Sequence, residues 1–194
     1  MRKIFLLCVL LLIVIGGGLS WFLMRHGFSA REKPLAFEAF LARNARRLAT
    51  PAGAREMRNP LAASEVAIAE ARDHFADHCA VCHANDGSGQ TEINEGLYPP
   101  APDMRRDETQ QLSDGEIFYI IRNGIRFTGM PGWGGEDEEN WKLVLFIRRI
   151  PKLTPKEIDL MREINKMEMQ VENRDSGEHG RKPEGEHDRK REKD

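Results

Sequence analysis

The pentapeptide Cys79-Ala80-Val81-Cys82-His83 determines how the rest of this chain is interpreted. The spacing C-x-x-C-H is the attachment signal of c-type haem: both thiols form thioether bonds with the haem vinyl groups, and the adjacent imidazole ligates the iron. A redox dithiol would need a βαβ setting and a zinc site a second ligand pair. The sequence shows no such setting, and His74 and His78 both lie upstream on the same helix. We therefore expect one covalently bound haem c, held by Cys79, Cys82 and His83.

Helix-capping signals surround this motif, and no alternating strand pattern appears. The signals are Ser64 before EVAIAEARDHFADHC, the capping box of Ser113 and Glu116 before IFYIIRN, the acidic run 136–139 before NWKLVLFIRRI, and the capping box of Thr154 and Glu157 before EIDLMREINKM. These patterns predict a small all-α domain with long loops, above all residues 84–112. A core of that size needs an additional stabiliser, which the covalent haem supplies.

A second axial ligand has to come from a residue that reaches the opposite face of the haem, and a methionine thioether there raises the reduction potential. Of the eight methionines, Met104 and Met130 alone lie outside the apolar head, the linker and the last helix. Met130 lies in Thr-Gly-Met-Pro-Gly-Trp, where glycine permits close approach and proline stiffens the loop. Met104 is interpreted as an apolar residue that packs on the haem edge. We expect His83 and Met130 to ligate the iron, and this arrangement leaves no open position for catalysis.

The N-terminal head, residues 4–24, has neither a charge nor a proline. As a helix rising about 1.5 Å per residue it would span roughly 30 Å, the thickness of bilayer hydrocarbon. A signal peptide cleaved after Ser20, with Gly18 at position −3, is the alternative. Because the apolar run continues from Trp21 to Arg25, we favour a membrane anchor.

Composition divides the chain into four parts: a transmembrane anchor or uncleaved signal (1–24), a basic juxtamembrane linker (25–61), the haem domain with its final helix (62–173) and a disordered charged tail (174–194). The linker has eight basic and three acidic residues, whereas the haem domain has twelve basic and twenty-one acidic residues. The net charge of −2 argues against a nucleic-acid-binding protein. The linker fits two interpretations equally well: an amphipathic helix on an anionic membrane, or a solvated spacer.

Residues of roughly 64–151 resemble a class I monohaem cytochrome c of the bacterial membrane-anchored type, related to the haem-bearing cytochrome c subunits of terminal oxidases. The motifs that carry the resemblance are HCAVCHANDGSG, YPPAPDM, SDGEIFYIIRNG, TGMPGW and NWKLVLFIRRIP. The resemblance implies the cytochrome c fold, in which the helix ending at Cys79 crosses the helix that starts near Trp141. Ala71 and Phe75 would meet Leu145 and Phe146 at this crossing. It also implies that the Pro102 carbonyl accepts the ring N–H of His83.

These features together predict an electron-transfer protein rather than an enzyme: a membrane-anchored c-type cytochrome that carries single electrons in a respiratory chain. Two alternatives remain, an electron-accepting haem subunit of a periplasmic dehydrogenase and a haem-based redox or gas sensor.

The linker has more Lys and Arg than the N-terminus, which by itself favours a cytoplasmic body. Because covalent haem attachment takes place outside the cytoplasm, we expect a single-pass protein of the bacterial inner membrane with its haem domain in the periplasm. Its acidic surface predicts redox partners with a basic docking patch.

Overall fold

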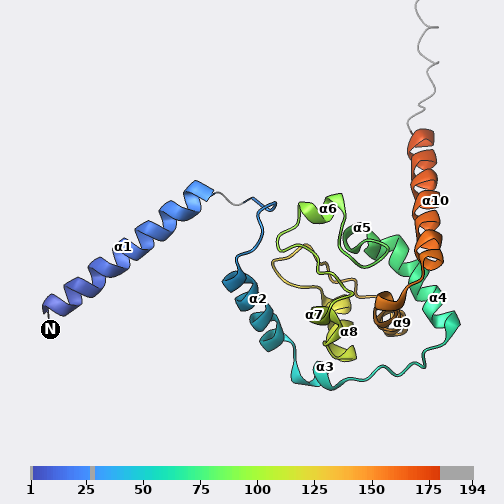
Figure 1. Cartoon of the computed structure of the whole chain (residues 1–194), viewed down its shortest axis with the longest axis horizontal. Helices are drawn as coiled ribbons and strands as arrows, with labels where there is room; N and C mark the ends of the chain where they lie inside the picture. The colour runs from blue at the N-terminus through green and yellow to red at the C-terminus, as the bar shows by residue number, and fades with distance from the viewer. Residues whose placement is uncertain (1, 27–28, 180–194) are drawn as a thin grey trace, which may run out of the picture.

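The computed structural model describes residues 2–26 and 29–179, and within these ranges all regular structure is helical. The all-α prediction is therefore confirmed. Figure 1 shows α1 apart from the body, whereas α10 starts at the body and projects away from it. The elements are α1 (Arg2–His26), α2 (Ala36–Ala49), α3 (Ala52–Glu56), α4 (Glu65–His74), the π-helical turn η1 (Phe75–Cys79), α5 (Ala80–His83), α6 (Glu92–Glu95), α7 (Asp107–Gln110), α8 (Asp114–Asn123), α9 (Asp137–Arg149), the 3-10 turn η2 (Ile150–Lys152) and α10 (Pro155–His179).

The apolar N-terminal segment forms one helix, and residues Arg2–Phe22 of α1 are long and apolar enough to cross a membrane. A signal sequence has the same length and composition. The large apolar side chains of α1, such as Leu7 and Leu12, are exposed rather than packed on the body. This helix therefore adds nothing to the core of the haem domain.

The crossing of α4 and α9 forms the centre of the core. Ala71 of α4 is almost fully buried, and its small side chain permits the two helices to approach closely. Next to it the rings of Phe75 and Phe146 lie 5.1 Å apart between centroids, and both are buried. At the surface the Lys142 ammonium lies 2.9 Å from the Glu70 carboxylate and joins the same two helices. The expected helix crossing is present, with Leu145 only half-buried at its edge.

The capping residues recognised in the sequence form the expected hydrogen bonds. The Ser64 hydroxyl accepts from the Ala67 N–H at 3.1 Å. Ser113 and Glu116 bond reciprocally at 3.1 and 2.8 Å, as a capping box requires. The acceptor at the start of α10 is likewise Thr154. These local signals explain why the helices begin at the positions that the sequence predicts.

One difference from the expected single helix lies at its end. The helical structure does not end at Cys79. After α4 the chain forms the wider π-turn η1, and it then continues as α5 to His83. The carbonyl of Ala76 in this turn accepts a hydrogen bond at 2.5 Å from the Asn165 side chain of α10. Met161 of α10 is fully buried in the same core. The last helix therefore supports the π-turn, and it runs to His179, while residues 180–194 of the expected disordered tail lie outside the described residues.

The segment between α1 and α4 also packs on the body. Ala54 of α3 is buried, and its carbonyl lies so close to Gly115 of α8 that a side chain at position 115 would collide with the α3 backbone. The Asn59 side chain donates to the Trp141 carbonyl at 2.9 Å. This part of the chain is thus fixed to α8 and α9.

Candidate functional site

The attachment turn, residues 79–83, carries both cysteines and the histidine on one helical surface. Cys79 ends η1, and Cys82 and His83 lie in α5, three and four residues later. Residues at these spacings share one face of a helix. Both cysteines are free thiols, not joined by a disulfide. The structure therefore brings three of the four predicted site residues together.

The electrostatic surroundings of the two thiols favour their neutral form. Burial raises the pKa of Cys79 to about 12, with smaller contributions from Asp77 and Cys82, and burial also raises the pKa of Cys82. A reactive redox dithiol needs a thiolate, which these surroundings disfavour. Among residues 2–26 and 29–179 no group of three His, Cys, Asp or Glu side chains is placed to hold a metal ion. Both alternatives considered from the sequence are thus less well supported than haem attachment.

The imidazole of His83 is buried, with 7% of its surface exposed. Burial lowers the pKa of His83 to about 4, and the Pro102 carbonyl acts in the opposite direction through a hydrogen-bond interaction. Nδ1 nevertheless lacks a partner at full hydrogen-bond geometry, so the contact with Pro102 is a loose one. A neutral, buried imidazole with Nδ1 near a carbonyl is the form in which histidine ligates iron through its other nitrogen. The residues present therefore fit a covalently bound haem.

Beyond His83 the chain reverses sharply. Ala84 has φ +61°, a conformation that L residues rarely adopt. The N–H of Gly89 then donates back to the His83 carbonyl at 2.8 Å. Asn94, which sequence reasoning missed, closes this loop: its buried amide donates to the Gly89 carbonyl at 2.5 Å and accepts from the Ala101 N–H at 2.5 Å. An isolated asparagine in a long loop gives no signal of such a role.

Met104 and Met130 occupy different surroundings. Met104 belongs to the buried core, and its backbone N–H donates to the Gly87 carbonyl at 2.8 Å. At Gly87 a side chain would collide with Ile150, so this part of the core is closely packed. Met130 instead is half-buried on the loop between α8 and α9. Met104 is thus engaged in packing, and the surroundings of Met130 are those of a residue on a positioned loop.

The loop that contains Met130, residues 124–135, is named the ligand loop after the iron ligand predicted for it, and it is held by the end of α8. Gly124 has φ +68°, and the backbone of residues 130–132 lies so close to it that a side chain there would collide. The N–H of Ile125 donates to the Met130 carbonyl, and the N–H of Trp133 donates to the Ile121 carbonyl, both at 3.1 Å. The Thr128 hydroxyl accepts from the Met130 N–H, also at 3.1 Å. The backbone on both sides of Met130 is therefore fixed.

A ring contact joins the ligand loop to the attachment turn. The Trp133 indole stacks on the His78 imidazole with centroids 5.6 Å apart and an interplanar angle of 23°. His78 immediately precedes Cys79, and Trp133 lies three residues after Met130. The attachment turn and the ligand loop, which carry the predicted haem residues, are thus joined by this contact. The sequence had no signal for this pair, because its members lie 55 positions apart in the chain.

The ligand loop carries exposed aromatic side chains, and the acidic run 136–139 at the start of α9 follows it directly. Phe127 is 92% exposed and has φ +62°, and Trp133 is 44% exposed. Asp137, in the acidic run at the start of α9, pairs with Arg122 of α8. An exposed aromatic side chain held in an unfavourable backbone conformation marks this loop as a candidate contact surface.

Residues 66–147 match the family model described as cytochrome c oxidase, cbb3-type, subunit III. A comparison with curated proteins found no match. The matched segment begins in α4 and ends in α9, so it contains the attachment turn and the ligand loop. The first three helices and α10 lie outside it.

Proposed function

Residues 66–147 form a haem-bearing cytochrome c domain related to terminal-oxidase subunits, and on this premise we propose that the protein is a membrane-anchored electron carrier of a respiratory chain. The observation that carries the proposal is the attachment turn, where two unpaired thiols and a buried neutral imidazole share one helical surface. A haem bound there supplies a one-electron iron couple. Cys79 and Cys82 would hold one haem through thioether bonds, and His83 would be one axial ligand.

In this proposal Met130 would also ligate the haem iron. The hydrogen bonds of its loop support the assignment, as does the contact between Trp133 and His78 that joins this loop to the attachment turn. Met104 is committed to the core. With histidine and methionine on the two sides, no coordination position stays open for a diatomic substrate, which favours electron transfer over catalysis.

In this proposal α1 anchors the haem domain at the outer face of the bacterial inner membrane. The length and apolar character of Arg2–Phe22 support an anchor. Covalent haem attachment takes place outside the cytoplasm, and this chemistry supports placement of the domain in the periplasm. The redox partner would meet the ligand loop, where Phe127 and Trp133 are exposed, and the acidic run 136–139 that follows it in the sequence. Such a surface fits a partner with a basic patch.

Stopped-flow reduction of the detergent-solubilised full-length chain by membrane components that copurify with it tests this proposal. We expect the second-order rate constant to fall as ionic strength rises, because a Debye length of about 8 Å at physiological salt screens exposed charges. A rate that is independent of salt would remove the acidic surface from the proposal. Carbon monoxide binding to the reduced protein at neutral pH would favour a gas sensor over an electron carrier.

A further inference from the structure

Helix α2 has two faces of different character. At about 100° per residue, its large apolar side chains fall on one side, and Ala39 and Arg46 fall on the opposite side. Ala39 and Arg46 are half-buried, whereas every large apolar side chain of the helix is exposed: Phe37 by 70%, Phe40 by 56%, Leu41 by 50% and Leu48 by 82%. The apolar face of α2, defined by these four residues, therefore points away from the haem domain.

Contacts on the other side keep this face turned outward. Glu38 accepts a hydrogen bond from the Tyr98 hydroxyl, which raises the pKa of Tyr98 to about 12. Arg43 lies 3.1 Å from Glu108 of α7. Beyond the helix, the close approach of α3 to Gly115 holds the following segment on α8. Packing on the protein itself is thus not available to the apolar face.

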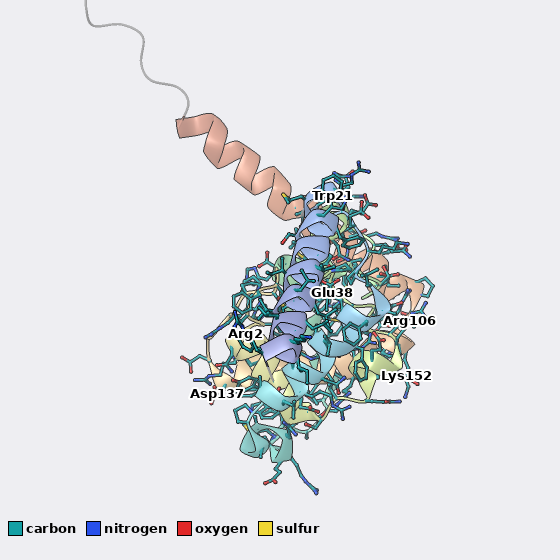
Figure 2. The ribbon with its side chains drawn as sticks, turned by 90° about the vertical axis from the view of Figure 1, so that its left-hand side faces the viewer. Arg2, Trp21, Glu38, Arg106, Asp137 and Lys152 are labelled. Atoms are coloured by element: carbon teal, nitrogen blue, oxygen red, sulfur yellow. The ribbon has the colours of Figure 1, made fainter. Side chains whose placement is uncertain are left out.

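The membrane surface is within reach of this helix. Nine residues separate His26, the last of α1, from Ala36, the first of α2. A fully extended chain of that length covers about 30 Å at most. Figures 1 and 2 place α2 on the side of the body that lies toward α1, with Glu38 in view from that side. A membrane that holds α1 therefore lies near α2.

The charges around the apolar face of α2 indicate which kind of surface covers it. Arg47 borders this face, and residues 25–61 carry eight basic side chains against three acidic ones. Apolar side chains flanked by arginine match the boundary between acyl chains and anionic headgroups. A second copy of the chain would place the same basic residues against one another in a symmetric contact.

We propose that α2 lies in the interface of an anionic bilayer and buries Phe37, Phe40, Leu41 and Leu48 among the lipids. This inference rests on the anchoring part of the proposed function. It implies that the haem domain rests against the membrane instead of moving freely on a solvated spacer.

Spin labels on single cysteines test this proposal in the full-length, haem-loaded chain reconstituted into vesicles of anionic and zwitterionic phospholipids. One label is placed at Phe40→Cys and a control at Ala42→Cys, both in a Cys8→Ser background. Ala42 is exposed and lies about 200° around the helix from Phe40. The native Cys8 in α1 is labelled separately and reports the anchor. Power saturation with oxygen, which concentrates in lipid, and with a water-soluble nickel chelate measures the depth of each label.

We expect the ratio of oxygen to nickel collisions to be several-fold higher at position 40 than at position 42, and the difference to grow with the anionic lipid content. Nickel access at both positions with a deeply buried Cys8 label would overturn the inference and leave the anchor intact. A position-40 label shielded from both reagents would mean that a protein covers this face, which also overturns it. Nickel access at Cys8 would remove the anchor itself, and this inference with it.

Discussion

The attachment turn and the ligand loop, the two segments that we propose to hold the haem, are built in opposite ways. The attachment turn is helical, its neighbour Phe75 is fully buried, and α10 supports it from behind. The ligand loop lacks regular structure from residue 124 to 135, and backbone hydrogen bonds to the end of α8 and one partly exposed ring stack hold it. Local opening takes place where few buried contacts oppose it. The histidine side of the site is thus a fixed part of the core, and the methionine side is the part that can open.

Removal of both thiols is expected to have the largest effect, because it breaks the fixed side. In a Cys79→Ser/Cys82→Ser variant no thioether bond can form, so haem is lost completely from the denatured chain. A denaturing gel stained for haem peroxidase activity measures this loss. Cys8→Ser removes the third cysteine, which lies in α1, and is expected to retain the full signal. Haem that stays on the double variant through denaturation would contradict covalent attachment at this turn.

Substitution of Met130 breaks the side that can open. Met130→Ala is expected to keep the haem attached but to lose the sulfur-to-iron charge-transfer band and to lower the reduction potential, because water replaces the thioether. Met104→Leu, a nearly isosteric change in the core, is the matched control and keeps the band. The absorption spectrum of the ferric protein distinguishes the two. Loss of the band in the Met104 variant alone would reverse the assignment.

Removal of the ring stack sharpens the comparison. Trp133→Ala removes its contact with His78, worth about 0.5–1.5 kcal/mol, while the backbone hydrogen bonds of the loop remain. Opening of the methionine side then becomes easier, and the affinity of the ferric iron for added imidazole is expected to rise by roughly 2- to 10-fold. Trp133→Phe retains a ring, so its imidazole affinity is expected to lie between those of the unaltered protein and the alanine variant. Unchanged imidazole affinity in the alanine variant would mean that the stack does not restrain the loop.

The smallest expected effect concerns strain on the fixed side. Ala84 adopts φ +61°, which glycine tolerates at lower cost, so Ala84→Gly is expected to stabilise the haem domain by up to about 1 kcal/mol. Ala80→Gly, at a helical position in α5, is the control and is expected to destabilise it by about 1 kcal/mol or more. Guanidinium unfolding followed by tryptophan fluorescence measures both. A destabilised Ala84 variant would show that the methyl group contributes packing that outweighs the strain.

Features that depend on neighbouring residues could be predicted from the sequence. The starts of three helices could be predicted from Ser64, Ser113 and Thr154, because a capping side chain bonds to an N–H only three residues away. The attachment turn is equally local, since its three residues span a single helical turn. The C-x-x-C-H spacing therefore predicts haem attachment without any knowledge of the fold.

Features that depend on close approach of distant segments could not be predicted. The contact of α3 with Gly115 and the stack of His78 on Trp133 arise only when the body is assembled. The π-turn at Phe75–Cys79 has no pattern of its own, and it depends on Asn165 of the last helix. The role of Asn94 is equally hidden, because a buried amide and a solvated one look the same in a sequence.

The hydrogen bond from Asn165 to Ala76 joins residues 89 positions apart, and this distance along the chain sets an order of events. A chain that is delivered across the membrane from its N-terminus presents α4 and the attachment turn well before α10. Contacts between segments that are far apart in the sequence form late, because the chain between them has to be ordered first. The contact between Asn165 and the π-turn would therefore form only after α10 is delivered. If the haem domain is exported as we propose, both thiols would be accessible during that interval, and the order of export would leave time for haem attachment before the core closes.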